Sequence, residues 1–337
     1  MAHFASILKL FLVISLLNSC FSSRIIGRTL VPDDTQYNLL QYHKGPLLSG
    51  KISINLIWYG KFKPSQRAII ADFISSLSTT TSAQSQPSVA SWWKQIENYY
   101  HLANSKNPPS LYLYLGQQIL DENYSLGKSL TRQNIVQLAS KSQQKNAINV
   151  VLTADDVTGA VVSKGNKNYY SKSKFAYIWV GNSETQCPGY CAWPFHQPQY
   201  GPQNPPLIPP NNDVGLDGMV INLGRLLAGT TTNPFGNGYY QGPAEAPLEA
   251  ASACPGVYAK GAYPGYAGDL LVDPTTGASY NAHGTNGRKF VLPAIYDLST
   301  TTCSTLPMYW SMRSKKQVES ARPTAISAYN PRIGLCV

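Results

Sequence analysis

Charge is scarce in this sequence. Only 13% of the 337 residues are Asp, Glu, Lys or Arg, while 43% are hydrophobic. A disordered chain would carry more charge and fewer apolar groups, so this composition excludes general disorder and indicates a globular fold with a sizeable core. The 27 basic residues outnumber the 17 acidic ones, and the net charge of +10 favours an acidic partner.

Apolar runs long enough to cross a membrane are also missing. The most apolar stretch, Leu10–Leu17 (LFLVISLL), follows Lys9 and precedes several small residues. A membrane-spanning helix needs about 20 apolar residues, whereas a short apolar run between a basic residue and small residues is typical of a secretory signal peptide. We therefore expect residues 1–23 to be a signal peptide, and the mature chain to be secreted and to start near Arg24. Nucleic acid is not an expected partner, because neither a zinc finger nor a basic helix is present.

Six cysteines are too few for a fold held together by disulfides alone. Four of them lie in the body of the chain: Cys187, Cys191, Cys254 and Cys303. Two disulfides would suit an oxidising compartment, and three pairings are possible. We favour Cys187–Cys191, because Pro188-Gly189 between them forms turns readily, together with Cys254–Cys303. A zinc knuckle is the alternative, although it lacks a second closely spaced pair.

Helical and strand patterns alternate along the chain. Strands are predicted at 51–59, 111–115, 148–153 and 174–180, with shorter ones around 270–273 and 289–295, and helices at 64–78, 88–103, 131–143 and 216–228. This alternation is typical of an α/β protein, here a single domain with a mixed sheet flanked by helices. Residues 188–213 are rich in Pro, Gly, Asn and Gln and predict a long irregular loop that carries cysteines.

Four long segments resemble the plant Exordium and phosphate-induced protein family. They are residues 39–77, 180–206 (VGNSETQCPGYCAWPFHQPQYGPQNPP), 211–254 and 277–303 (GASYNAHGTNGRKFVLPAIYDLSTTTC). The resemblance implies a secreted protein of the apoplast or cell wall that promotes cell expansion and growth and is linked to the brassinosteroid response. It brings no established catalytic activity. The Exordium-like domain would span 24–307, and residues 308–337 depart from the pattern, so we expect a loosely ordered extension there.

Catalysis by zinc is not predicted. Some relatives carry a His-Glu pair on the helix that matches 216–228 and resemble zincin peptidases, whose chemistry needs two His four residues apart and a Glu beside the first. The matching stretch here reads Gly224-Arg225-Leu226-Leu227-Ala228, which lacks both metal ligands and the base. We expect no enzyme activity, metal or cofactor, and a fold that is distantly zincin-like at most. A degenerate metallopeptidase stays open as an alternative.

The remaining histidines and nucleophiles assemble no site in the sequence. His43, His101, His196 and His283 are scattered without ligand spacing, and no Gly-x-Ser-x-Gly elbow occurs.

Two groups of carboxylates each allow a structural and a functional interpretation. Asp155-Asp156 follow a predicted strand and form either a turn or a catalytic pair. Asp213 and Asp217 lie near Asn211 and Asn212, where they could hold Ca²⁺ or cap the following helix. The turn and the cap are the favoured interpretations.

Aromatic residues suggest a binding role. The chain has 22 Tyr and six Trp, and aromatic faces stack on sugar rings while basic groups pair with acidic sugars. The candidate ligand-binding residues are Tyr190, Trp193, Phe195, His196, Arg225, Tyr239 and Tyr240. The structural alternative is that these aromatics pack the irregular loops. Asn123 begins an Asn-Tyr-Ser sequon and is a candidate glycosylation site.

The sequence features and what the resemblance implies together lead us to expect a monomeric extracellular growth protein that acts by binding. Its partner would be a cell-wall polysaccharide or an extracellular protein. An acidic-polysaccharide-binding module is the first alternative, and titration against demethylated pectin would separate the two.

Overall fold

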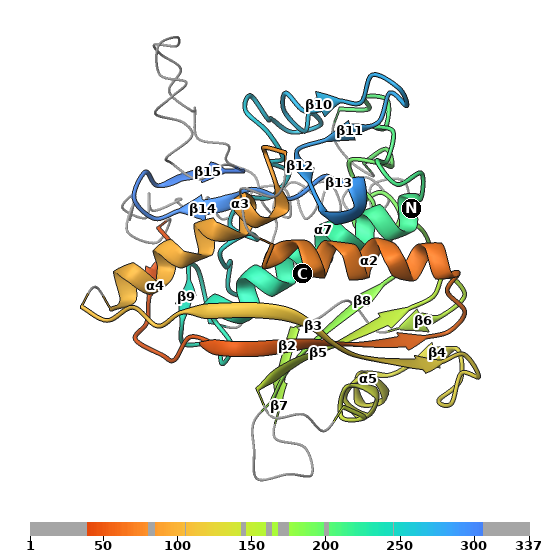
Figure 1. The fold of residues 1–337 in the computed structure, drawn as a ribbon, viewed down its shortest axis with the longest axis horizontal. Coiled ribbons are helices and arrows are strands. Elements are labelled where there is room, and N and C mark those ends of the chain that lie inside the picture. Colours follow the sequence, from red (N-terminus) through yellow and green to blue (C-terminus); the bar gives the residue numbers. More distant parts are fainter. Residues whose placement is uncertain are drawn as a thin grey trace, which may run out of the picture. The chain divides into compact units, whose positions relative to one another are not determined.

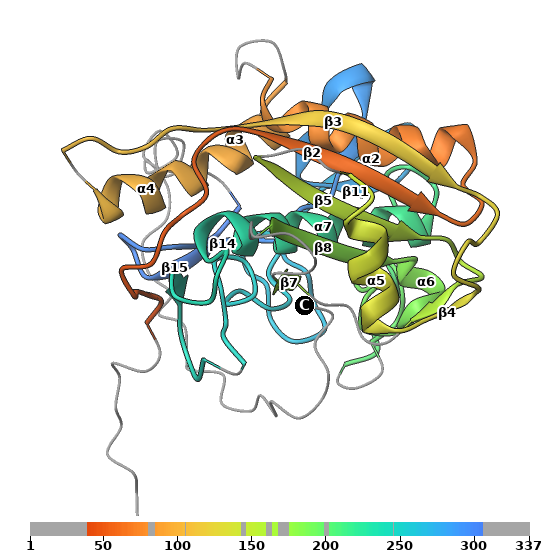
Figure 2. The same ribbon diagram turned by 90° about the horizontal axis from the view of Figure 1, so that it is seen from below.

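A five-stranded mixed sheet organises the chain. The computed structural model describes residues 39–305 except 80–84, 105, 143–145, 160–163, 168–174, 199–201 and 245. The sheet has the order β3-β2-β5-β8-β7, with β2, β3, β5 and β8 parallel and β7 antiparallel at one edge (Figure 2). Its strands are β2 (Gly50–Tyr59), β3 (Leu111–Asp121), β5 (Ala147–Thr153), β7 (Lys164–Lys167) and β8 (Phe175–Gly181). The predicted α/β class with a mixed sheet is confirmed.

Helices cover both faces of this sheet. They are α2 (Pro64–Leu77), α3 (Val89–Trp93), the 3-10 turn η3 (Lys94–Ile96), α4 (Glu97–Ala103), α5 (Arg132–Ala139), α6 (Ser183–Gln186) and α7 (Val214–Thr232). In Figure 1, α2, α3 and α7 lie over one face and α5 over the other. Apolar side chains from the sheet and from both helical layers pack together in the main core. The predicted helix at 88–103 is present as the consecutive pieces α3, η3 and α4.

Short strand pairs form a further layer above α2, α3 and α7 (Figure 1). Antiparallel pairs join β10 (Leu271–Val272) to β11 (Ser279–Tyr280), β12 (Ala282–His283) to β13 (Lys289–Phe290), and β14 (Ile295–Asp297) to β15 (Thr302–Ser304). Elsewhere β1 (Gln41–Tyr42) pairs with β9 (Tyr239–Tyr240), β4 (Ser129–Leu130) pairs with β6 (Thr158–Gly159), and η4 (Thr285–Gly287) links β12 to β13.

Helix α5 ends four residues earlier than predicted, and the reason is a buried asparagine. It begins as expected at Thr131, whose hydroxyl accepts the Asn134 N–H at 3.2 Å. At the other end, the Asn149 side chain on β5 donates to the Ala139 carbonyl at 2.8 Å. That bond satisfies a terminal carbonyl from outside the helix, so the chain turns away.

Helix α7 continues four residues beyond its predicted end. Its last turn is Gly229-Thr230-Thr231-Thr232, a sequence of low helix propensity. The hydroxyls of Thr231 and Thr232 donate to the Leu227 and Ala228 carbonyls at 2.9 and 2.8 Å. These residues are fully buried. Their packing and internal hydrogen bonds therefore outweigh their low helix propensity.

One of the two favoured disulfides is present and the other is not. Cys254 and Cys303 are bonded, which ties the loop after β9 to β15. The predicted Cys187–Cys191 bridge is wrong, because Cys187 is a thiol while Cys191 takes part in a disulfide of its own. The CPGYC loop closes instead through its backbone, with the Cys191 N–H donating to the Cys187 carbonyl at 2.9 Å. The turn was predicted correctly, but it forms without a disulfide bond between its two cysteines.

Among the helices of the described residues, none has the length and hydropathy needed to span a bilayer. The predicted signal peptide and the predicted extension at 308–337 lie outside the described residues.

Candidate ligand-binding site on helix α7

Helix α7 lies at the centre of the described fold, between the sheet and the C-terminal strand pairs (Figure 1). It begins after Asp213, whose Oδ1 accepts the Leu216 N–H at 2.9 Å and whose Oδ2 accepts a hydrogen bond from Gln66 on α2, also at 2.9 Å. A carboxylate at this position satisfies an unpaired N–H and complements the helix dipole. Asp213 is therefore a helix cap, as the favoured interpretation predicted.

The segment that would carry zinc ligands is packed into the core. A Cβ atom on Gly224 would lie 3.3 Å from the Trp92 ring and 3.5 Å from the Phe73 ring. Leu226, Leu227 and Ala228 are fully buried. Because Trp92 is also held by a 2.7 Å hydrogen bond from its Nε1 to the Pro293 carbonyl, a larger side chain at 224 would displace a fixed ring.

Arg225 differs from its helical neighbours. The residue is only half-buried, yet its Nε is out of contact with water and has no hydrogen-bond partner. None of the ion pairs among the described residues includes Arg225. Buried donors without an acceptor are rare in folded proteins, so this guanidinium is a candidate for recognising an anion.

Tyr258 is the neighbour that orients Arg225. Burial raises the pKa of the Tyr258 phenol, and the positive charge of the nearby Arg225 guanidinium offsets part of that rise. The Tyr258 hydroxyl in turn donates to the Trp193 carbonyl at 3.3 Å. The Trp193 and Tyr258 rings lie 5.3 Å apart, centroid to centroid. A chain of contacts therefore links the half-buried Trp193 to the arginine on α7.

A small second core supports this arrangement. Phe195 and Tyr258 pack with three residues from other segments, Ile221, Ala267 and Val291, and Trp193 lies against this cluster. The structure thus brings together three predicted ligand-binding residues, Trp193, Phe195 and Arg225. Sequence reasoning missed Tyr258, because it lies in an irregular loop with no motif around it.

The contacts described for the other predicted ligand-binding residues, Tyr190, His196, Tyr239 and Tyr240, are made with other parts of the fold. Tyr190 lies in the CPGYC turn, where its N–H donates to the Cys187 carbonyl at 3.2 Å. His196 Nε2 lies 4.0 Å from Glu184 Oε1, which makes an ion pair only when the imidazole is protonated.

Tyr239 and Tyr240 belong to the β1–β9 pair instead. Tyr239 stacks on Tyr42, with centroids 4.7 Å apart, and is buried. Tyr240 stacks on His43 at 3.7 Å. Both tyrosines pack a strand pair, which is the structural interpretation of these aromatics.

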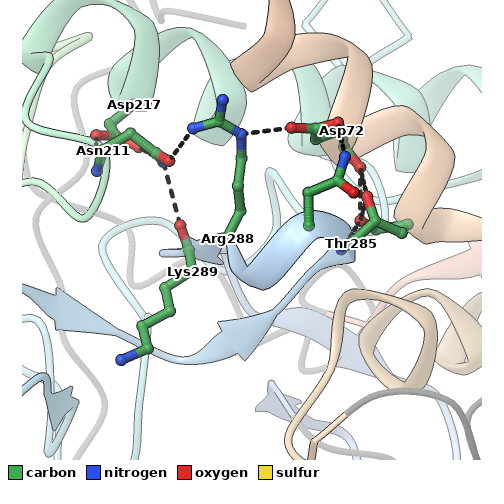
Figure 3. A network of polar contacts seen from close by, with 8 residues as sticks. Asp72, Asn211, Asp217, Thr285, Arg288 and Lys289 are labelled. Carbon is green, nitrogen blue, oxygen red and sulfur yellow. Dashed lines mark hydrogen bonds and ion pairs between the residues drawn. The ribbon is translucent and has the colours of Figure 1, made fainter.

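A polar network ties the start of α7 to α2 and to the β12–β13 connection (Figure 3). Arg288 Nε lies 2.5 Å from the Asp72 carboxylate on α2, and its Nη1 donates to Asn211 Oδ1 at 3.0 Å. Asn211 donates from its backbone and side chain to the two oxygens of Asp217, at 2.9 and 2.6 Å. Sequence reasoning did not detect the Asp72–Arg288 pair, since 216 residues separate its members.

Asp217 is a buried acid rather than a calcium ligand in this arrangement. Its side chain is 2% exposed, and both carboxylate oxygens accept hydrogen bonds from Asn211. Burial raises its pKa to about 7, and the nearby Asp213 adds to the rise, while the bonds from Asn211 oppose it. No group of three or more His, Cys, Asp or Glu side chains in the described part of the chain is arranged to hold a metal ion.

The remaining sequence candidates lie at the surface. Asp155-Asp156 form a turn after β5, as favoured. Burial alone would raise the pKa of Asp156, but hydrogen bonds from Lys128 and Tyr124 lower it. Asn123 lies exposed in a turn after β3, a position that a glycosylating enzyme could reach. Its glycosylation stays a prediction.

Comparison with known proteins identifies the family. The model of the phosphate-induced protein 1 conserved region matches residues 40–306. The chain belongs to the phosphate-induced protein 1 family. It is 71% identical over 315 residues to "Protein PHOSPHATE-INDUCED 1" of Nicotiana tabacum, covering 90% of this chain and 99% of that protein. It is 66% identical over 312 residues to "Protein EXORDIUM" of Arabidopsis thaliana, covering 89% and 98% respectively. No solved structure matches.

More distant members of the phosphate-induced protein 1 family are also similar to this chain. "Protein EXORDIUM-like 3" of Arabidopsis thaliana is 37% identical over 283 residues, covering 79% of this chain and 82% of that protein. The expected Exordium and phosphate-induced membership is confirmed, and the matched region contains both α7 and the loops around Arg225.

Proposed function

We propose that this member of the phosphate-induced protein 1 family is a secreted protein of the apoplast or cell wall. It promotes cell expansion, in connection with the brassinosteroid response, by binding a partner rather than by catalysis. The signal-peptide pattern of residues 1–23 and the disulfides at Cys191, Cys254 and Cys303 support an extracellular location. Its partner is a cell-wall polysaccharide or an extracellular protein.

The packing of helix α7 is the observation that supports action without catalysis. Metal-dependent peptidases of the zincin type place a His at the position of Gly224 and a Glu beside it. Here, Gly224 has aromatic rings within 3.5 Å of where a Cβ atom would lie, and Arg225 supplies a positive charge that would repel a metal ion. A degenerate metallopeptidase is therefore the less supported alternative.

The Nε donor of Arg225, which lacks an acceptor, favours a second candidate function, an acidic-polysaccharide-binding module. Arginine recognises carboxylates through a planar fork of N–H donors. The two candidates are compatible, since polysaccharide binding would be the means by which a wall protein acts on growth.

The test uses the full chain, secreted by plant cells that lack their own family members. We expect recovery of the protein in apoplastic fluid and longer cells than in plants that express a chain lacking residues 2–23. The recovered protein should release no product from casein or from wall polysaccharides. Retention inside the cell, unchanged cell length, or turnover that one substitution abolishes would each contradict the proposal.

A further inference from the structure

We infer that Arg225, Tyr258 and Trp193 form a binding site for a carboxylate-bearing sugar. This inference rests on the proposed function, because it names the class of ligand through which a wall-binding protein would act. It starts from Arg225 Nε, a buried donor with no partner among the described residues.

The described contacts leave the Nε donor of Arg225 without an acceptor, although the residue as a whole is only half-buried. The Arg225 guanidinium lies close enough to the Tyr258 phenol to lower its pKa, and the Tyr258 hydroxyl donates to the Trp193 carbonyl. These contacts orient the guanidinium without supplying an acceptor to Nε. A carboxylate can bind Nε and a neighbouring Nη together through two parallel hydrogen bonds, an arrangement that a single-oxygen acceptor cannot reproduce. A carboxylate is therefore the acceptor that suits this guanidinium best.

The aromatic neighbour favours a sugar over a peptide as the bearer of that carboxylate. The Trp193 ring lies against Tyr258, and Trp193 is only half-buried, so part of this residue is exposed to solvent. A pyranose ring has a flat face of C–H groups that packs on such a ring, while its carboxylate projects from the ring edge. A uronic acid unit presents both features at once.

Disulfide-bonded cysteines lie close in sequence to both aromatic residues. Trp193 follows the disulfide-bonded Cys191 by two residues, and Tyr258 follows Cys254 of the Cys254–Cys303 bridge by four. Arg225 lies on a buried helix. A site whose parts are held before the ligand arrives loses less conformational freedom on binding.

The first experiment needs no variant. Titration calorimetry of the full secreted chain with trigalacturonate, at low and at moderate salt, should show saturable binding that weakens as salt rises. The fully methyl-esterified trimer should bind at least about tenfold more weakly, because it lacks the anion that Arg225 recognises. Equal affinity for acid and ester, or no binding of the acid at low salt, overturns the inference. Tighter binding of a neutral peptide with a free C-terminal carboxylate overturns the sugar assignment.

The second experiment separates the site from the general positive charge. Arg225→Met should lower the affinity for trigalacturonate about tenfold or more, whereas Arg132→Met, which removes an exposed arginine from α5, should change it by less than about twofold. Arg225→Lys keeps the charge but loses the fork, and we expect affinity between those of wild type and Arg225→Met. Equal losses in Arg225→Met and Arg132→Met overturn the inference. Thermal unfolding shows whether each variant is folded. If Arg225→Met does not fold, the comparison of the acid and ester trimers with the wild-type chain tests the inference instead.

The growth assay distinguishes failure of this inference from failure of the proposed function. If wild type promotes cell expansion but does not bind trigalacturonate, the ligand assignment fails and the growth function stands. If wild type binds trigalacturonate through Arg225 but has no effect on cell length, the site stands and the growth function fails.

Discussion

Arg288 and Asp72 form an ion pair that joins two distant segments, with Arg288 Nε 2.5 Å from Asp72 Oδ2 and a sequence separation of 216. The side chains are 24% and 15% exposed, so the pair is largely shielded from water. Asn286 Nδ2 also donates to Asp72, at 2.8 Å, and the Thr285 hydroxyl donates to the Asp72 carbonyl at 3.2 Å. The β12–β13 connection is thus fastened to α2 by several bonds to a single residue.

Removing one member of this pair should destabilise the fold. Asp72→Ala leaves Arg288 shielded without its partner, and we expect the free energy of unfolding to fall by about 2–4 kcal/mol. Urea denaturation measures the change, and the double variant Asp72→Ala/Arg288→Met serves as the control, since it removes both charges. A loss below about 0.5 kcal/mol in the single variant would show that water already screens the pair.

Asp217 should make stability depend on pH. Its folded pKa of about 7 lies above the usual value of 3.8, so the folded state binds its proton more tightly than the unfolded state does. Its contribution to stability is fully present below about pH 4 and is lost as pH rises to about 7. Each tenfold difference in proton affinity corresponds to about 1.4 kcal/mol, so the stability lost over this range is about 4 kcal/mol at most.

The variant Asp217→Asn isolates this effect because residue 217 no longer titrates. Asp213, the nearby charge that adds to this shift, remains in both proteins. Urea denaturation between pH 4 and 8 should show that wild type loses stability relative to Asp217→Asn as pH rises. Parallel stability curves for the two proteins would refute the shifted pKa.

Gly224→Ala should destabilise α7 even though alanine favours helices. In an exposed helix the exchange stabilises by about 1 kcal/mol. Here the added Cβ would lie 3.3 Å from Trp92, whose indole N–H is fixed to the Pro293 carbonyl. We expect a net loss of about 1–2 kcal/mol in chemical denaturation. A gain in stability would mean that Trp92 and Phe73 can move, and that position 224 has room for a side chain.

The Cys254–Cys303 disulfide should contribute strongly to stability. It closes a loop with a sequence separation of 49, for which chain-entropy arguments give about 4 kcal/mol. Cys254→Ser/Cys303→Ser should therefore unfold at a markedly lower temperature, while Cys187→Ser, which removes a thiol outside any disulfide, should unfold close to wild type. Similar melting temperatures for the two variants would contradict this role.

Local patterns in the sequence predicted four of the five strands of the sheet and its longer helices. The alternation of Ile52, Ile54, Leu56 and Trp58 defines β2, and Pro64 marks the first residue of α2. Strand β7 was missed because its sequence, KGNK, is short and polar. The predicted end of α5 was wrong because Asn149, from another element, caps it.

Less of the candidate site could be predicted. Arg225 was found because the family resemblance drew attention to α7, and Trp193 and Phe195 because aromatics are conspicuous in an irregular loop. Tyr258 and the Asp72–Arg288 pair were missed, since their partners come from distant segments and only the folded chain brings them together. The burial that raises the pKa of Asp217 likewise cannot be deduced from its neighbours in the sequence.

Titration of the secreted chain with trigalacturonate, followed by chromatography of the recovered sugar, tests the central claim most directly. The claim is that this protein binds an acidic wall sugar at Arg225 and leaves it unchanged. The account predicts saturable binding that Arg225→Met weakens about tenfold or more, with intact trimer recovered. Binding unaffected by Arg225→Met, or shortened sugar in the recovered sample, would contradict it.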